Sequence, residues 1–222
     1  MTTGNSDWTS TQNLAGLPEG QVRSILGYAG ESLVIGRALA CGFNLFFKAW
    51  RDSKYDAVLD AVGQLFRIEI KQSGDGTQLS CTSGGRSGAQ ISRDAASREE
   101  VLSPEESDFL IGVHTFSGKC WVVPTEVIYY RNRKTNPTWS LDDYEEKWAI
   151  FSKPPFNFTL EEIRKGFRNL SESELEDIGI RIGLTKPTNL SYKFSARSQA
   201  VDLPAIKDWY VLEIWSTIFK AI

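Results

Sequence analysis

The chain has 222 residues, 41% of them hydrophobic, and a formal net charge of −3 at neutral pH. That apolar content is enough to build a core and excludes a disordered chain. No apolar run approaches the roughly 20 residues needed to cross a bilayer. Residues 1–13 lack the charged and then apolar pattern of a signal peptide. We therefore expect a cytoplasmic globular protein with no membrane association.

Cysteine and histidine usage argues against zinc, thiol and serine-type chemistry. The three cysteines, Cys41, Cys81 and Cys120, are far apart and form no CxxC pair, so we expect reduced thiols in or near a core. The single histidine, His114, lies in an apolar run that predicts a strand. A structural role is favoured there over that of a catalytic base.

The chain begins with a small, polar segment, residues 1–16, which favours a loose arm. From Val22 to Ala40, apolar residues then recur at spacings of three and four, which predicts a helix. Gly42 is a suitable stop for that helix.

Strand-forming segments follow the helix. Val62 and Gly63 separate two of them and predict a hairpin turn. A Gly/Ser-rich loop region, residues 73–93, comes next, with room for one strand. The segments rich in β-formers are residues 42–50, 55–61 and 65–71, with two more runs within 105–124. The order helix, three strands, loop, two strands indicates an α/β core with a mixed sheet.

The last third of the chain has a different texture. Residues 125–156 are aromatic and irregular, whereas residues 158–170 predict a helix with Thr159 and Glu162 at capping-box spacing. Residues 171–184 favour another short helix. The end, residues 203–222, is apolar nearly all round if helical, which indicates deep burial or contact with another subunit. A strand over residues 209–215 is the alternative.

The hairpin carries the chemistry. Alternation along a strand directs Ile68 and Ile70 to the core and Glu69 and Lys71 to the other face. If Val62–Gly63 is a two-residue turn, residue 61 pairs with residue 64 and Asp56 lies opposite Glu69. A slip of one residue would turn Asp56 to the wrong face.

Two carboxylates and a lysine on one face suit metal-assisted phosphodiester hydrolysis. Mg²⁺ takes oxygen ligands and keeps several waters, so Asp56, Glu69 and a phosphate oxygen make a sufficient site. Lys71 can hold the attacking water or offset negative charge. Asp60 shares the face of Asp56 and is the main alternative for the aspartate of the metal site. Asp52 is a weaker candidate for that position.

These residues resemble the signature of the PD-(D/E)XK nuclease superfamily. Asp56 is followed by twelve intervening residues and then Glu69-Ile70-Lys71, with Tyr55 where the name has proline. The resemblance implies a restriction-endonuclease-like core over residues 17–128. Further positions are similar to Holliday-junction resolvases and intron-associated homing endonucleases of this superfamily: Gly30-Glu31, Gly42-Phe43, Asp108-Phe109 and Trp121–Pro124. Glu31 is accordingly expected as an outer carboxylate of the site.

Two stretches are candidates for DNA contact in spite of the acidic net charge. The glycine-rich loop after the catalytic strand carries side chains of the types that pair with base edges in the major groove. The second stretch is basic and aromatic, residues 129–134, with a core-edge strand running into a polar loop as the alternative. The residues singled out are Arg86, Ser87, Gln90, Arg93, Arg131 and Arg133.

The sequence thus predicts an α/β, restriction-endonuclease-like core with a C-terminal α-rich extension, residues 129–222, for dimerisation, DNA recognition or both. The expected function is Mg²⁺-dependent, site-specific cleavage of double-stranded DNA, of restriction or homing type. Because one such site cuts one strand, we expect a homodimer or higher homo-oligomer. The alternatives are a junction-resolving nuclease and a catalytically inactive DNA-binding module.

Overall fold

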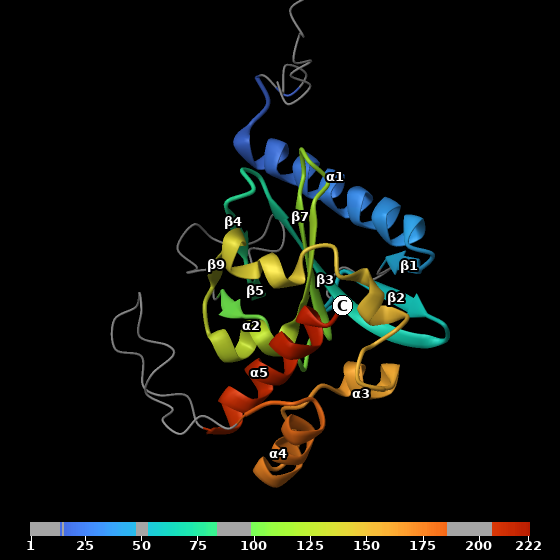
Figure 1. Cartoon of the computed structure of the whole chain (residues 1–222). Helices are drawn as coiled ribbons and strands as arrows, with labels where there is room; N and C mark the ends of the chain where they lie inside the picture. Colours follow the sequence, from blue (N-terminus) through green and yellow to red (C-terminus); the bar gives the residue numbers. More distant parts are fainter. Residues whose placement is uncertain (1–13, 15, 48–52, 84–98, 186–205) are drawn as a thin grey trace, which may run out of the picture.

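The computed structural model describes residues 14, 16–47, 53–83, 99–185 and 206–222 (Figure 1). Five strands form the main sheet, and helices lie on both of its sides. The elements in chain order are α1 (Glu19–Ala40), β1 (Asn44–Phe47), β2 (Ala57–Ala61), β3 (Gln64–Ser73), β4 (Gln78–Ser80), β5 (Thr82–Ser83), β6 (Glu100–Val101), β7 (Phe109–His114), β8 (Cys120–Pro124), α2 (Thr125–Arg131), β9 (Thr135–Pro137), η2 (Thr138–Tyr144), η3 (Trp148–Phe151), α3 (Leu160–Lys165), α4 (Glu172–Arg181) and α5 (Ile206–Lys220).

The main sheet is mixed. Its strand order is β1-β2-β3-β7-β8, with β3 and β7 parallel and the other neighbours antiparallel. A parallel pair needs a crossover, and here the crossover contains the short strands β4, β5 and β6, of which β4 pairs with β9. The predicted fold class, an α/β core with a mixed sheet and an α-rich C-terminal part, is confirmed.

The hairpin between β2 and β3 has the predicted register. Val62 and Gly63 form its turn with φ angles of 54° and 86°, and positive φ at both central residues gives a turn whose twist matches the strands. Ala61 pairs with Gln64, and the ladder runs on to Ala57 opposite Ile68.

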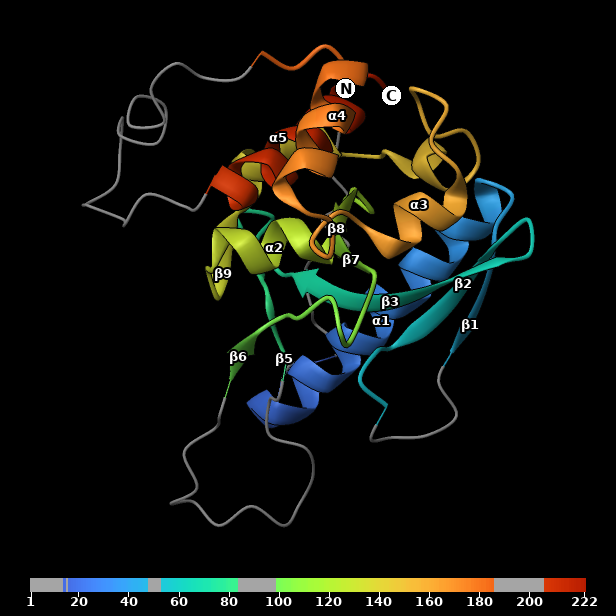
Figure 2. The ribbon, with the colours of Figure 1, turned by 90° about the horizontal axis from the view of Figure 1, so that it is seen from below.

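The two faces of the sheet are covered by different elements. On one face α1 packs closely, since a Cβ on Gly30 would lie 3.3 Å from Val113 Cγ1 and 3.4 Å from Gln72 Cβ. On the other face β4 approaches β7, since a Cβ on Gly112 would lie 2.5 Å from Leu79 Cδ2. Figures 1 and 2 show α2, α4 and α5 on the side of the sheet away from α1.

The core joins the two predicted parts of the chain. Phe66 and Phe109 from the sheet pack edge-to-face on Phe151 from η3, with ring centroids 5.1 and 4.9 Å apart. Trp215 of α5 packs on Phe109 at 6.1 Å. The expected boundary at residue 128 falls within α2, so residues on both sides of it share one hydrophobic cluster.

Three expectations for the C-terminal part can be compared with the structure. Thr159 caps α3 in a capping box with Glu162, as predicted. Residues 206–220 form a helix, which excludes the strand alternative, and seven of its side chains are buried. The stretch from residue 125, expected to be irregular, instead begins with α2, which Pro124 precedes and Asn132 ends in a left-handed conformation.

Within the described ranges, no helix combines the length and apolar character that a membrane crossing needs.

Candidate active site

Asp56 lies immediately before β2. Its backbone N–H donates at 2.9 Å to the carbonyl oxygen of Ile68, the residue that pairs with Ala57. Its carboxylate oxygen Oδ2 accepts a hydrogen bond from the Ile70 N–H, also at 2.9 Å. These two bonds attach Asp56 to β3 on either side of Glu69, whereas the paired register of the hairpin ends at Ala57 and Ile68, so the pairing of Asp56 with Glu69 stays a prediction.

Glu69 and Lys71 lie together on one face of β3, and Ile68 and Ile70 lie on the opposite face. Lys71 Nζ is 2.5 Å from Glu69 Oε1, a short, charge-assisted hydrogen bond. Glu69 is only 7% exposed, and the Lys71 side chain is 25% exposed. An ordinary surface Glu–Lys pair would be open to solvent, so this burial argues against that alternative.

Asp60, the rival aspartate, has a structural task at the turn. Its Oδ1 accepts a hydrogen bond from the Gly63 N–H at 2.8 Å, which closes the hairpin as an Asx turn does. Asp60 pairs with Leu65 at the far end of the ladder from Glu69. The second rival, Asp52, lies outside the described residues.

Glu31 is half-buried on α1. Gly30, the preceding residue, packs against Gln72, and Gln72 alternates with Lys71 along β3. The helix therefore covers the opposite face of β3 from Glu69 and Lys71. The described contacts pair Glu69 with Lys71 and bond Asp56 to the Ile70 N–H of the same strand. The place of Glu31 in the site stays a prediction.

The residues expected to contact DNA have different surroundings. Arg131 is held by the protein itself, because its Nη1 donates to the Ser140 carbonyl oxygen at 3.1 Å and its guanidinium lies 5.9 Å from the Tyr144 ring centroid. Arg133 is exposed. Four members of the set fall outside the described residues: Arg86, Ser87, Gln90 and Arg93.

The residue set fits a hard divalent cation with few protein ligands. In the part of the chain that the structure describes, no three or more His, Cys, Asp or Glu residues form a metal-binding group. Mg²⁺ does not need such a cluster, because it is commonly held by one or two carboxylates, waters and a substrate phosphate. Asp56 and Glu69 supply oxygen donors of this kind on one face of the hairpin.

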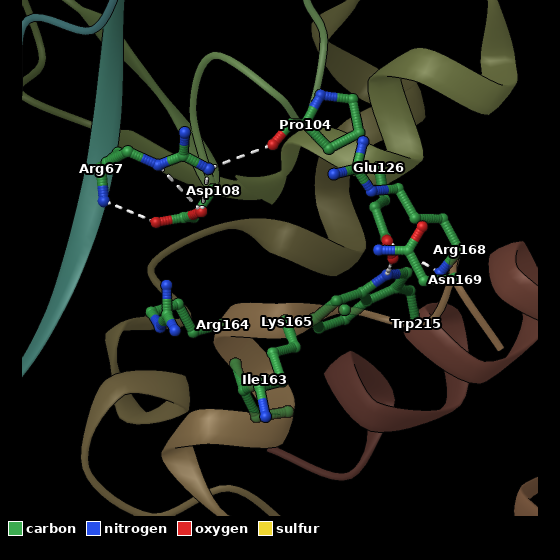
Figure 3. A pocket seen from close by; sticks show the side chains of 11 residues that line it. Arg67, Pro104, Asp108, Glu126, Ile163, Arg164, Lys165, Arg168, Asn169 and Trp215 are labelled. Atoms are coloured by element: carbon green, nitrogen blue, oxygen red, sulfur yellow. Dashed lines mark hydrogen bonds and ion pairs between the residues drawn. The ribbon is translucent and has the colours of Figure 1, made fainter.

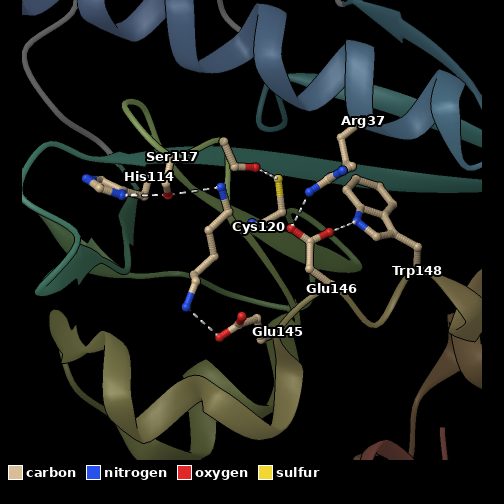
Figure 4. A network of polar contacts seen from close by, with 9 residues as sticks. Arg37, His114, Ser117, Cys120, Glu145, Glu146 and Trp148 are labelled. Carbon is tan, nitrogen blue, oxygen red and sulfur yellow. Dashed lines mark hydrogen bonds and ion pairs between the residues drawn. The ribbon is translucent and has the colours of Figure 1, made fainter. Parts of the chain in front are cut away.

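The thiols and the histidine do not form a nucleophilic site. Cys120 is buried beside Glu146, and burial raises the pKa of its thiol to about 12. His114 Nδ1 lies 2.7 Å from Ser117 Oγ at the β7–β8 turn. Figure 4 shows these contacts, with Glu146 joining Arg37 of α1 to Trp148. Cys81 and Cys120 are buried, as expected for thiols of a core, whereas Cys41 is exposed.

Two charged groups near the site were not singled out from the sequence. Arg67 precedes Glu69 by two residues on the same face, and its Nη2 lies 2.6 Å from Asp108 Oδ1. The alternation of side chains along a strand places Arg67 on the same face as Glu69, and this was the only sequence signal for it. Glu126, on α2, accepts hydrogen bonds from the backbone N–H groups of Phe167 and Arg168. No local pattern reveals that contact, which spans about 40 residues of chain.

Comparison with known proteins gives little beyond this geometry. The chain matches no protein-family profile and no curated protein. It is similar to the solved structure of a bacterial homing endonuclease, I-Ssp6803I, with 17% sequence identity over 57% of this chain and 90% of that chain. The TM-score is 0.45, so this likeness carries no argument about function.

Proposed function

We propose that this chain is a Mg²⁺-dependent endonuclease that hydrolyses phosphodiester bonds of double-stranded DNA. The observation that carries the proposal is that Lys71 Nζ lies 2.5 Å from the nearly buried Glu69 carboxylate, while the Asp56 carboxylate accepts a hydrogen bond from the Ile70 N–H of the same strand. The opposite face of the same strands already forms the core, through Ile68 and Ile70. A nearly buried carboxylate on the second face therefore needs an explanation other than hydrophobic packing.

Each of the three side chains has a distinct task in such a reaction. Asp56 and Glu69 provide carboxylate oxygens for the metal, and the hydrogen bond from the Ile70 N–H keeps the Asp56 carboxylate oriented. When bound, Mg²⁺ supplies Lewis-acid polarisation of the phosphate and lowers the pKa of its bound water. Lys71 Nζ lies where it can orient the attacking water or offset the charge that develops on the phosphate.

The remaining roles also belong to the proposal. Glu31 acts as an outer carboxylate, and Arg133 together with Arg86 and Gln90 contacts the DNA. Because one such site cuts one strand, a homodimer would cut both. Site-specific cleavage of restriction or homing type is favoured over junction resolution, since the chain extends well beyond a minimal core. An inactive module is disfavoured because all three charged side chains, Asp56, Glu69 and Lys71, are present.

The direct test is cleavage of supercoiled mixed-sequence plasmid by the wild-type chain and a Glu69→Gln variant. We expect nicked and linear products with Mg²⁺, none with EDTA, and a fall of at least a hundredfold for Glu69→Gln. Glu172→Gln, at an exposed position of α4, is the matched control and should cut like the wild type. Equal cleavage in EDTA, or by Glu69→Gln, would refute the proposal.

A further inference from the structure

A cavity of about 190 Å³ lies between β3 and the α3–α4 segment, on the side of Arg67 (Figure 3). Since a liquid water occupies about 30 Å³, this volume holds a phosphate-sized group with several waters. The cavity is not the Asp56–Glu69–Lys71 site itself. It adjoins that site, because Arg67 precedes Glu69 by two residues on one strand face, a separation of roughly 6.7 Å along β3.

The cavity lining is cationic. Two carboxylates, Asp108 and Glu126, face a larger number of cations. The cationic lining residues are Arg67, Arg164, Lys165 and Arg168. Arg67 is paired with Asp108, Lys165 with Glu161 at 2.8 Å and Arg168 with Glu105 at 3.0 Å. Among the described residues, Arg164 is therefore the cation of the lining that has no ion pair, and it is the one that an entering anion would meet.

Both carboxylates of the lining are already engaged by other groups. Asp108 pairs with Arg67 at 2.6 Å and accepts the Arg67 backbone N–H at 2.7 Å. Glu126 accepts hydrogen bonds from the N–H groups of Phe167 and Arg168 and from Trp215 Nε1 at 2.8 Å. Neither carboxylate is therefore committed to Arg164.

Two guanidinium groups of the lining have buried donors without an acceptor. The Nε atoms of Arg164 and Arg168 are buried and have no hydrogen-bond partner among the residues that the structure describes. Buried polar atoms are nearly always hydrogen-bonded in folded proteins. Two orphaned N–H donors on one cationic cavity thus indicate a missing acceptor with several oxygens.

From these observations we propose that the cavity binds a phosphate group of the DNA backbone, next to the bond that is cut. The inference rests on the proposed function and names a contact of the substrate outside the reacting atoms. Guanidinium groups match phosphate oxygens in charge and geometry. A B-DNA strand carries a phosphate about every 3.4 Å of helix axis, so the cavity would hold a phosphate one to three nucleotides from the scissile one.

The test removes one cation from the cavity and one from the opposite side of the molecule. Arg164→Gln changes the cavity, while Arg23→Gln changes an exposed α1 residue that pairs with Glu19. Binding of a mixed-sequence 30-base-pair duplex is measured at several salt concentrations, with Ca²⁺ replacing Mg²⁺. Thermal melting of both variants checks that they are folded, and Arg164→Lys serves as a charge-conserving variant.

We expect Arg164→Gln to weaken binding about tenfold or more, the loss of one charge-assisted hydrogen bond. Its slope of log K against log salt should fall by about 0.9, the value for one lost phosphate contact. Arg23→Gln should change neither quantity, and Arg164→Lys should keep the wild-type slope. A wild-type slope for folded Arg164→Gln, or no duplex binding by the wild type, would overturn the inference.

A second arm separates the backbone from free anions. Inorganic phosphate is titrated into the wild type and into Arg164→Gln, and binding is followed by intrinsic tryptophan fluorescence and calorimetry. Phosphate binding that depends on Arg164, with an unchanged duplex slope, would assign the cavity to a free anion and contradict the DNA contact. Cleavage by Glu69→Gln would refute the nuclease proposal alone, because the salt slope is measured without cleavage.

Discussion

Two nearly buried glutamates of this chain have opposite surroundings. Glu126 is 4% exposed, and its carboxylate accepts hydrogen bonds from two backbone N–H groups and an indole. Glu69 is 7% exposed and is paired with the ammonium group of Lys71. The first carboxylate joins α2, α5 and the segment after α3, whereas the second lies beside Lys71 on the face of β3 opposite Ile68 and Ile70.

The two surroundings distinguish a carboxylate with a structural role from one with a proposed catalytic role. Fixed dipoles that enclose a carboxylate stabilise one arrangement of the chain. A flexible lysine beside a carboxylate can exchange its partner for a metal, a water or a phosphate. We therefore expect changes at Glu126 to alter stability and changes around Glu69 to alter activity.

The largest expected effect is on catalysis. Lys71→Ala should lower the rate of plasmid cleavage by about 10²–10⁴-fold, the range for a lost electrostatic or proton-transfer group. The variant should still unfold cooperatively, because Lys71 is outside the hydrophobic core. Initial cleavage rates and urea unfolding measure the two effects, and Lys119→Ala, at an exposed pair with Glu145, is the control. Full activity of Lys71→Ala would remove Lys71 from the mechanism.

The next effect is on stability. Glu126→Ala leaves the N–H groups of Phe167 and Arg168 and the Trp215 indole without their acceptor, which should reduce the free energy of unfolding by about 3–5 kcal/mol. Urea denaturation gives this value. The loss of cleavage per folded molecule should be far smaller than that of Lys71→Ala, so a selective loss of activity at wild-type stability would reverse the assignment.

A substitution at Gly166 tests the packing of the Glu126 carboxylate against the backbone. Gly166 has φ +66°, and a Cβ there would lie 2.4 Å from Glu126 Oε1. Gly166→Ala should therefore cost about 1–3 kcal/mol through overpacking, beyond the backbone strain. Gly183, with φ +81° and nothing within 4 Å of an added Cβ, is the matched control for that strain alone. Equal losses in the two variants would show that Glu126 is not held against this backbone.

The smallest expected effect is on pH dependence. Burial raises the pKa of Glu126, and the surrounding N–H donors offset only part of this change. A raised folded pKa favours folding fully below the unfolded value of about 4.3, and this contribution is lost as the pH rises through the folded pKa. Relative to Glu126→Gln, the wild-type free energy of unfolding should thus fall as the pH rises above the unfolded pKa of about 4.3. Parallel stability curves for the two proteins would contradict this.

Local sequence patterns were sufficient to predict the elements that carry the candidate active site. The spacing of apolar residues predicted α1, and Val62–Gly63 predicted the turn that sets the register of β2 and β3 from Ala61–Gln64 to Ala57–Ile68. The capping box at Thr159 likewise depends only on neighbours in the chain. These features are determined by residues that are close together in the sequence, so sequence patterns predict them.

Contacts between distant segments were not accessible in this way. Nothing near Glu126 indicates that residues 167, 168 and 215 supply its hydrogen-bond donors. Arg131 was predicted as a DNA contact from the basic stretch, and that role stays a prediction. Its contacts with Ser140 and Tyr144, which come from a later turn of the chain, could not be inferred from that stretch. Such roles are decided by tertiary packing, which neither periodicity nor charge pattern encodes.

The central claim, that the hairpin register builds a metal site at Asp56 and Glu69, is tested most directly by comparing two aspartates on one strand face. Plasmid cleavage rates are measured with Mg²⁺ for Asp56→Asn and Asp60→Asn. Asp56→Asn should lose activity by at least a hundredfold, whereas Asp60→Asn should retain most of it, because Asp60 only caps the turn at the Gly63 N–H. An active Asp56→Asn beside an inactive Asp60→Asn would contradict the account.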